Sequence, residues 1–515
     1  MKSLVRRVLK RFGYEPVRQR SYFSAAVDSR LTTDWFGASA SPTMELWGSL
    51  QKIRDRARDL ERNNPLVRRY LHLVAENVVG HKGIRLQARN LLPGGRPNTQ
   101  ANAAIEAAFA DWHRPEHCTV EGRLSWVGVQ QQVVRSVARD GEAFLRLIQG
   151  GPYGFALQQF DPELVDETYN RAAGDGKNAI RMGVEVDQWG RAVAYHVFRS
   201  YQYDLTGGNR ERVRVPAAEI VHLFIPRRPG QTRGESWLAP VMLPLRMLDG
   251  YAEAELVAAR TAAAKMGFIQ RSADNPSADN PDAPAKTDME AAPGVIDYLD
   301  PGDTFQGWDP THPSGNFGAF VTQVEKIIAG GLNVAYSSLS GDLREVNYSS
   351  IRAGLLQERD GWRSLQSWLA CHLCETVYRH WREVAWTTGR LSLRMPPQEY
   401  RAHVWQPRGW AWIDPEKDVT ASAKAVAFGF TSRRRVVGED GEDFEEILAD
   451  LAVEQELAAA EGVTLMLPQG VSNGQGEGAG PGNPDEDADG GSGGAARARR
   501  GRDADTRLAL LRSAR

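Results

Sequence analysis

Residues 54–83 read RDRARDLERNNPLVRRYLHLVAENVVGHKG, and this stretch decides the fold. It opens with a dense mixture of Arg, Asp and Glu, which is typical of a helix with paired surface charges. Pro65 suits the first turn of a second helix, Asn63 or Asn64 suits its N-cap, and Gly80 suits its end. The stretch therefore predicts two helices with a break at the proline. The second helix carries apolar residues at helical spacing, namely Leu66, Tyr70, Leu73, Val74 and Val78.

Three motifs, in this order along the chain, resemble the lambda-type family of phage portal proteins. The first is RARDLERNNP at 56–65 with NVVGHKGI at 77–84, and the second is NYSSIR at 347–352. The third is IDPEKD at 413–418, which is followed by GFTSR and an acidic run. The resemblance covers about residues 20–465.

The near-neutral net charge fits a protein through which DNA slides better than one that binds DNA tightly along its length. The chain has 515 residues, which is room for about three domains. Charged residues make up 25% of it, yet the formal net charge is only -2. A protein that lets DNA slide should not grip phosphate along its length, because each neutralised phosphate adds affinity and drag.

Cysteine content and hydropathy indicate a reducing compartment and no membrane span. Three cysteines, Cys118, Cys371 and Cys374, argue against a disulfide scaffold. No apolar run is long enough for a transmembrane helix, and no apolar segment follows the basic start as in a signal peptide. We therefore expect neither secretion nor membrane insertion.

Charge is segregated along the chain. Residues 1–20 carry seven Lys or Arg against one Glu, and the last twenty residues carry seven Arg against two Asp. These basic ends are expected to be solvated tails or contacts with nucleic acid or capsid. Residues 436–461 contain acids and no base, whereas the chain after Leu467 is too poor in large apolar residues to pack and is expected to be disordered.

Residues 112–226 mix helical and strand patterns, which predicts an α+β, mostly helical protein. Residues 129–137 have helical spacing, and 142–148 predict a strand after Asp140-Gly141. That turn resembles a family motif, and we interpret it as a tight hairpin. Further strands are expected at 183–186, 192–198 and 220–224.

Three long helices are expected in the second half of the chain. An Ala-rich helix is predicted over 234–266, with Ser236 as its N-cap, and Pro244 is expected either to kink this helix or to delay its start. A second helix is predicted over 320–332. A third, over 351–381, has an apolar stripe. The repeat SADNP-SADNP at 272–281 is expected to be a solvated loop, because no Glu or Gly completes a calcium-binding loop.

The family resemblance assigns a region to each of these segments. It implies a cyclic ring with the following parts: a basic N-terminal arm at 1–45, a wing at 46–233, a first stem helix at 234–266, a clip at 267–318, a second stem helix at 319–333, a tunnel loop at 334–350, a wing spine helix with following β and loop segments at 351–430, a helical crown at 431–466 and a disordered tail at 467–515. The loop is polar and lies between two helices. We expect its residues Arg344, Asn347 and Tyr348 to lie nearest the channel axis and to touch passing DNA. The charges of residues 54–62 are expected to be available for pairing between neighbouring subunits.

The resemblance also implies the function and the partners. It implies a portal protein, a dodecamer at one capsid vertex that nucleates head assembly, contacts the major capsid protein and scaffold, and passes double-stranded DNA. It further implies docking of the terminase large subunit and later of head-completion or tail connector proteins, in a virion assembled in the host bacterial cytoplasm. Twelve helices at ~10 Å spacing lie on a circle ~38 Å across, which leaves a bore of ~28 Å for a duplex.

No motif for chemistry is complete, so we expect no enzyme activity and no cofactor. The segment GDGKN at 174–178 fails as a phosphate-binding loop, no HExxH is present, and GESWL at 234–238 lacks the second Gly of a nucleophile elbow. Cys371 and Cys374 lack two further zinc ligands. The alternatives are another head-tail adaptor ring protein, or a metal-dependent nuclease that uses scattered acids with His113 and His117.

Overall fold

The computed structural model describes residues 39–463 except 175, 202–204, 206–210, 264–266, 272–302, 308–316, 345–347 and 412–413. The chain divides into two compact units, residues 1–448 and 449–515. The basic ends, the SADNP repeat and Asn347 lie outside the described residues.

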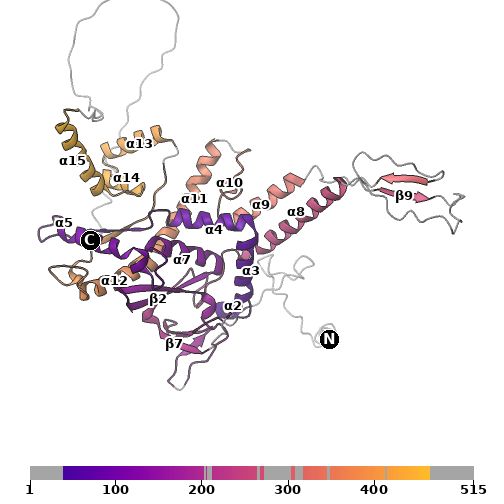
Figure 1. Cartoon of the computed structure of the whole chain (residues 1–515), viewed down its shortest axis with the longest axis horizontal. Coiled ribbons are helices and arrows are strands. Elements are labelled where there is room, and N and C mark those ends of the chain that lie inside the picture. Colours follow the sequence, from indigo (N-terminus) through magenta and orange to yellow (C-terminus); the bar gives the residue numbers. More distant parts are fainter. Residues whose placement is uncertain are drawn as a thin grey trace, which may run out of the picture. The chain divides into compact units, whose positions relative to one another are not determined.

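The opening stretch forms two helices, as its sequence predicts (Figure 1). After a short helix α2 (Pro42–Leu46), α3 spans Leu50–Asn63 and α4 spans Pro65–Val78. Asn64 caps α4, since its side-chain oxygen accepts the Val67 N–H at 3.1 Å. Gly80 follows α4 with φ +70°, a conformation that glycine adopts without strain.

Helices and antiparallel sheets follow, which makes the described chain α+β. The helices are α5 (Thr99–Trp112), α6 (Pro115–Cys118) and α7 (Trp126–Asp140). The strands are β1 (Arg85–Ala88), β2 (Glu142–Gly150), β3 (Gly154–Phe160), β4 (Ala179–Arg181), β5 (Val184–Val186), β6 (Ala192–Phe198), β7 (Arg212–Pro216) and β8 (Ile220–Phe224). One sheet has the order β3-β2-β8 and another the order β4-β5-β6-β7. The predicted strands at 192–198 and 220–224 are thereby confirmed.

The prediction of a hairpin at Asp140-Gly141 is wrong. Asp140 ends α7, and Gly141 caps that helix with φ +93°, so the turn joins a helix to a strand. A Cβ on Gly141 would lie 2.3 Å from the backbone of Glu235, and one on Gly234 would lie 2.1 Å from the carbonyl oxygen of Gly141. Two backbone segments therefore cross here at a distance that only glycines allow.

The same crossing explains why the first long helix begins later than predicted. Residues 232–238 are held against the α7–β2 turn, and the main-chain N–H of Trp237 donates to the Ala138 carbonyl at 3.1 Å. Helix α8 therefore begins at Met242, after a 3₁₀ turn, and spans Met242–Ala263. This late start agrees with the prediction that Pro244 kinks or delays the helix: Pro244 falls in the first turn, where its missing N–H costs no hydrogen bond.

A paired-helix arm follows. Strands β9 (Gly267–Arg271) and β10 (Asp303–Gly307) form an antiparallel pair, and α9 spans Phe317–Gly331. Helices α8 and α9 run side by side (Figure 1), and Tyr251 packs on the rings of Phe317 and Phe320 at 5.5 and 5.2 Å. The predicted second long helix is thus confirmed with a slightly earlier start.

The third long helix is confirmed and is longer than predicted. α11 (Tyr348–Leu369), a π-helical turn (Ala370–Cys374) and α12 (Glu375–Thr387) follow one another with helical backbone at both junctions. Its stripe supplies Trp381, which packs with Phe109 in an aromatic core that also holds Trp112, Trp126 and Tyr378. Such aromatic packing anchors the helix to α5 and α7.

The remaining elements close the fold. Strand β11 (His403–Gln406) pairs with β1, so segments more than 300 residues apart share a sheet. Three helices follow, namely α13 (Pro415–Ala427), α14 (Arg433–Glu439) and α15 (Phe444–Ala460). A 3₁₀ turn at Pro397–Glu399 precedes β11.

Candidate functional site

The connection between α9 and α11 holds the predicted site residues. It leaves α9 through Asn333, whose φ of +56° is the left-handed conformation that Asn tolerates better than most residues. A short helix α10 spans Tyr336–Ser340, and Gly341 ends it with φ +76°. From Leu332 to Gly341 the connection is therefore made of defined turns and a short helix.

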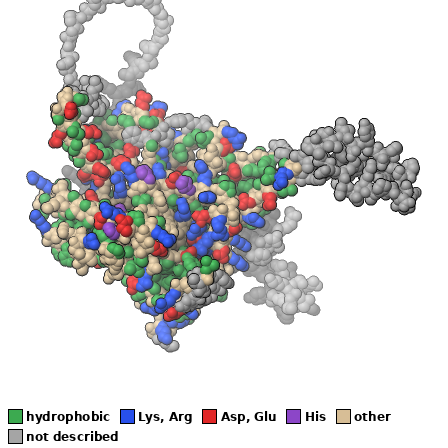
Figure 2. All heavy atoms as spheres, viewed as in Figure 1, with side chains coloured by type: hydrophobic (Ala, Val, Ile, Leu, Met, Phe, Trp, Pro, Cys, Tyr) green, Lys and Arg blue, Asp and Glu red, His purple; other side chains and the backbone are tan. Residues whose placement is uncertain are grey.

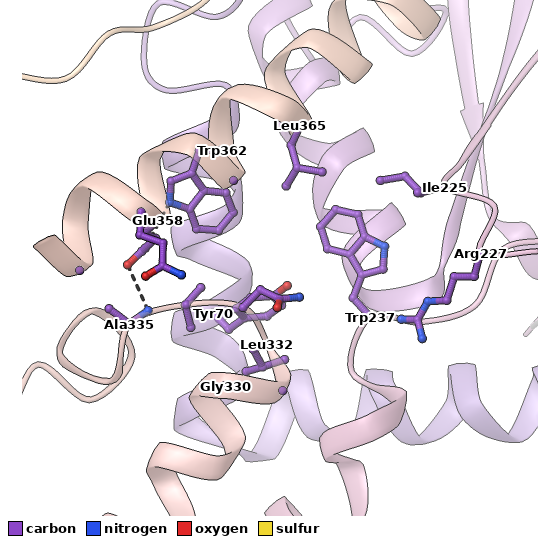
Figure 3. Close-up of a pocket in the computed structure, with 16 residues that line it drawn as sticks. Tyr70, Ile225, Arg227, Trp237, Gly330, Leu332, Ala335, Glu358, Trp362 and Leu365 are labelled. Carbon is purple, nitrogen blue, oxygen red and sulfur yellow. Dashed lines mark hydrogen bonds between the residues drawn. The ribbon is translucent and has the colours of Figure 1, made fainter. Parts of the chain in front are cut away.

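Glu358 of α11 fastens this connection (Figure 3). Its Oε2 accepts the Ala335 N–H at 3.2 Å and the Ser338 hydroxyl at 2.8 Å. Its Oε1 accepts the Trp362 indole N–H at 3.2 Å. One carboxylate thus ties the start of α10 to the middle of α11, with charge-assisted hydrogen bonds.

A second tether comes from α4 of the opening stretch. Arg69 Nε donates to the Ser338 carbonyl at 2.8 Å, and Leu339 is fully buried. Lys326 of α9 lies over the Tyr336 ring at 5.6 Å. Helices α4, α9 and α11 all hold α10, and of the described residues that follow it Gly341, Leu343 and Arg344 are exposed. We call residues 341–344 the tip of the described connection.

Asp342 and Arg344 make a local ion pair at this tip. The Arg344 main-chain N–H and Nε donate to Asp342 Oδ1 at 3.1 and 3.0 Å, and Nη2 lies 2.9 Å from Oδ2. Hydrogen bonding from the Arg344 side chain holds the pKa of Asp342 well below its ordinary value. Arg344 is 86% exposed, so its guanidinium is open to solvent and to a large ligand.

The three predicted site residues stand differently in the structure. Arg344 lies at the exposed tip, Tyr348 is the first residue of α11, and Asn347 is outside the described residues. Their common approach to a channel axis stays a prediction.

A cavity of about 710 Å³ adjoins the connection (Figure 3). Tyr70, Trp237, Trp362 and Leu365 supply its aromatic and aliphatic wall, and Arg227 lies at one end. Gly330 and Gly331 of α9 and Gly354 and Gly361 of α11 also line it. These glycines have no side chains to fill the space between α4, α9 and α11, the three helices that hold the connection.

A buried charge cluster, which no sequence pattern predicts, lies at the backbone crossing. Arg233 and Glu142 are both fully buried, with Nη2 2.6 Å and Nε 2.9 Å from the carboxylate. Arg54 Nη2 lies 3.5 Å from the same carboxylate, and His222 Nε2 lies 3.0 Å from it. Burial by itself would raise the pKa of Glu142, but the charge of Arg233 and hydrogen bonds from His222 and Arg233 outweigh burial and lower it. We call Glu142, Arg233, Arg54 and His222 the Glu142 cluster.

The prediction that the opening charges serve neighbouring subunits is wrong for three of them. Arg54 belongs to the Glu142 cluster, and Arg58 pairs with Asp140 at 2.9 Å and with Asp161 at 2.6 Å. Glu61 pairs with Arg139 at 2.6 Å. The sequence places these partners about 80 or more positions away, so only the tertiary fold reveals them.

Within the described residues, no group of three or more His, Cys, Asp or Glu could hold a metal ion. Cys374 is buried, and burial raises the pKa of its thiol, whereas Cys371 is exposed. Burial lowers the pKa of His113 to about 4, so this imidazole is neutral near pH 7. Among the helices of the described chain, none combines the length and the apolar composition of a membrane span.

Apolar side chains are exposed along the α8–α9 arm, where the space-filling view shows them among polar neighbours (Figure 2). Leu243 and Met247 of α8 are 69% and 66% exposed, and Phe320 and Ile327 of α9 are 53% and 58% exposed. Side chains of this size gain roughly 1.5–3 kcal/mol each when they are fully buried. The arm therefore presents faces that a single chain leaves uncovered.

Comparisons with known proteins agree on one family. Residues 28–366 match the model of the family described as phage portal protein, lambda family. The probable portal protein of Halomonas phage phiHAP-1 is 32% identical over 84% of this chain and 86% of that protein. Portal protein B of Escherichia phage lambda is 23% identical over 81% and 85%.

Two solved structures are also similar. A chain from the neck of a native gene transfer agent particle has 15% identity and a TM-score of 0.41, covering 74% of this chain and 92% of that one. A chain from the virion of the native particle has 12% identity and a TM-score of 0.43, covering 78% and 98%.

Proposed function

Because the chain belongs to the lambda family of phage portal proteins, which are bacteriophage virion proteins, we propose that its copies close into a ring, a dodecamer, at one capsid vertex. Double-stranded DNA passes through this ring during packaging and ejection. A closed ring arises when one heterologous interface repeats with rotational closure.

The uncovered apolar faces of the α8–α9 arm carry this proposal. If the arms of neighbouring copies pack side by side, Leu243, Met247, Phe320 and Ile327 lose contact with water. Helices pack at 8–10 Å between axes, which suits a ring of two-helix arms. We therefore assign α8 and α9 to the stem, the segment between them to the clip, residues 46–233 to the wing, and α14 and α15 to the crown region.

The connection at 334–350 is the segment that we assign to the channel wall. Its tethers through Glu358 and Arg69 fix α10, and its tip at residues 341–344 is exposed. Arg344, Asn347 and Tyr348 are proposed to lie nearest the axis. A mixture of one ion pair and polar groups contacts DNA without the drag of a continuous basic lining.

The remaining partners follow from this role. The clip meets the terminase large subunit and later the head-completion or tail connector proteins, and the wing and crown meet the major capsid protein and scaffold. ATP hydrolysis is supplied by terminase, so this chain acts without enzyme activity or cofactor. Assembly takes place in the host bacterial cytoplasm.

Negative-stain imaging of the purified full chain tests the ring. We expect closed rings with a central bore for the wild-type protein. Met247→Glu with Phe320→Glu should dissociate them, because two charges then face the neighbouring arm. Trp189→Glu is the control, since Trp189 is also a large exposed apolar residue but lies in the β5–β6 turn. Wild-type protein that stays monomeric would contradict the proposal.

The channel assignment is tested separately. The triple substitution Arg344→Ala, Asn347→Ala and Tyr348→Ala should leave rings intact but impair packaging or retention of DNA. If rings fail to form instead, the connection is an assembly element and the assignment is wrong.

A further inference from the structure

Three arginines surround one tryptophan on the face of α11 that packs against the segment after β11. The guanidinium carbons of Arg359, Arg363 and Arg408 lie 5.8, 5.6 and 5.7 Å from the centre of the Trp410 indole. Arg359 and Arg363 are one turn apart on α11, and Arg408 comes from the chain 45 residues beyond. We call these four residues the Trp410 cluster.

Neutral groups hold the cluster in place. The Trp410 indole N–H donates to Asn77 Oδ1 at 2.9 Å, and Arg359 Nη2 donates to the Ala411 carbonyl at 3.2 Å. Arg408 Nη1 donates to the Glu76 carbonyl at 2.6 Å, at the end of α4. Gly80 makes room for this side chain, since a Cβ at Gly80 would lie 2.8 Å from Arg408 Cδ.

The positive charge of the cluster is not balanced. Arg363 pairs with Asp360 at 2.8 Å on the exposed face of α11. In the part of the chain that the structure describes, Arg359 and Arg408 have no carboxylate within ion-pair distance. Burial lowers the pKa of Arg359, the like charges of Arg363 and Arg408 lower it further, and the negative charge of Asp418 offsets only part of this lowering. Three cations held together at a cost in repulsion are stabilised when an anion binds between them.

Phosphate is the anion that this geometry suits. Each guanidinium offers five N–H donors in a planar fork, and the carbonyl contacts use only one or two of them. Guanidinium forks form paired hydrogen bonds with phosphate oxygens. Trp410 is half-buried, so its indole acts as a rigid platform that limits the entropy lost when the arginines bind.

We propose that the Trp410 cluster binds phosphate groups of the DNA backbone. The identity of the polyanion rests on the proposed function, in which DNA passes this protein. Arg359 lies about three turns along α11 from Tyr348, the first residue after the connection. The cluster is then a second phosphate contact on the same helix, behind the channel tip, and holds DNA at one place rather than along the whole wall.

Fluorescence anisotropy tests whether the Trp410 cluster binds DNA. It measures the affinity of the purified full chain for a labelled DNA duplex over a series of salt concentrations. The variant Arg359→Gln/Arg363→Gln/Arg408→Gln should bind roughly tenfold or more weakly at low salt, and its slope of log K against log salt should fall by up to about 3. The control Arg96→Gln/Arg123→Gln/Arg394→Gln removes three charges at exposed positions elsewhere and should leave the slope near that of wild type. Equal slopes for both triple variants would overturn the proposal.

Circular dichroism melting checks that the triple variant folds. If it does not fold, Arg363→Gln alone, at the most exposed position of the cluster, should still lower the salt slope by about 1.

A second control replaces DNA with another polyanion. A peptide with the acidic sequence of residues 439–456 is added to the protein in place of DNA. Two results together would make the cluster a protein contact: the wild-type protein binds the peptide, and the triple cluster variant binds DNA as tightly as wild type does. The proposal then fails. Imaging the same samples separates this outcome from failure of the ring: intact rings with unchanged DNA binding reject the cluster alone.

Discussion

The Glu142 cluster and the Trp410 cluster each gather arginines from distant parts of the chain, but only in the first does the described chain give every arginine a carboxylate partner. Arg54 and Arg233 share the buried Glu142, and Arg58 nearby reaches three acids. In the Trp410 cluster, the described residues give an ion pair to Arg363 alone. Charge that is buried and matched stabilises one chain, whereas charge that is half-exposed and unmatched is available to a ligand.

The largest effect is expected from Glu142→Gln. Removing the carboxylate leaves Arg233 buried without its counter-charge, which costs about 3–5 kcal/mol of unfolding free energy. Denaturant unfolding followed by circular dichroism measures this. Glu219→Gln breaks the half-exposed pair with Arg146 and should change stability by less than about 1 kcal/mol. If both variants lose a similar amount of unfolding free energy, the Glu142 cluster contributes no more to stability than an exposed ion pair does.

Acid should weaken the Glu142 cluster and spare the Trp410 cluster. The pKa of Glu142 is lowered in the fold from 4.5, so its stabilisation is complete above that value and is lost as pH falls further. Burial lowers the pKa of His222 from 6.5, so protonation of the unfolded chain also favours unfolding as pH falls. Unfolding midpoints measured from pH 7 down to about pH 2.5 should decline in wild type. The Glu142→Gln variant should decline less below pH 4.5, and an unchanged slope would contradict the assignment.

The backbone crossing beside the Glu142 cluster should tolerate no side chain. Gly234→Ala forces apart two backbone segments and is expected to cost about 1–3 kcal/mol. Gly250→Ala lies within α8 with nothing within 4 Å of the new Cβ, so it should stabilise the chain by up to about 1 kcal/mol. Thermal unfolding of both variants gives the comparison. If Gly234→Ala leaves the unfolding temperature unchanged, the two backbone segments at the crossing can move apart at little cost.

The smallest effect on stability is expected at the Trp410 cluster. Arg363→Gln removes an exposed pair one turn apart and relieves repulsion on Arg359, so unfolding free energy should change by less than about 0.5 kcal/mol. The same substitution should lower DNA affinity, measured by anisotropy. A large loss of stability without a loss of affinity would make this cluster structural, like its counterpart at Glu142.

Local signals in the sequence predicted much of the fold. Asn64 and Pro65 mark the start of α4, and the patterns of β6 and β8 give their observed bounds. The stripe of α11 and α12 was visible as apolar spacing. These features depend on neighbours within a few residues, which a single sequence displays.

Features that depend on distant partners were missed. The α8 start at Met242 is decided by the crossing of Gly141 and Gly234, and Glu142 meets an arginine 91 positions away. The Trp410 cluster joins α4, α11 and the chain after β11, which no spacing rule connects. The π-helical turn at Ala370–Cys374 likewise had no signal that we identified.

A reconstruction of the purified full chain by cryo-electron microscopy is the decisive experiment for the ring. We expect a closed ring in which the α8–α9 arms of neighbouring copies are in contact and Arg344 lies nearest the axis of a bore wide enough for a duplex. Monomers, or a ring in which the connection between α9 and α11 faces away from the axis, would contradict it.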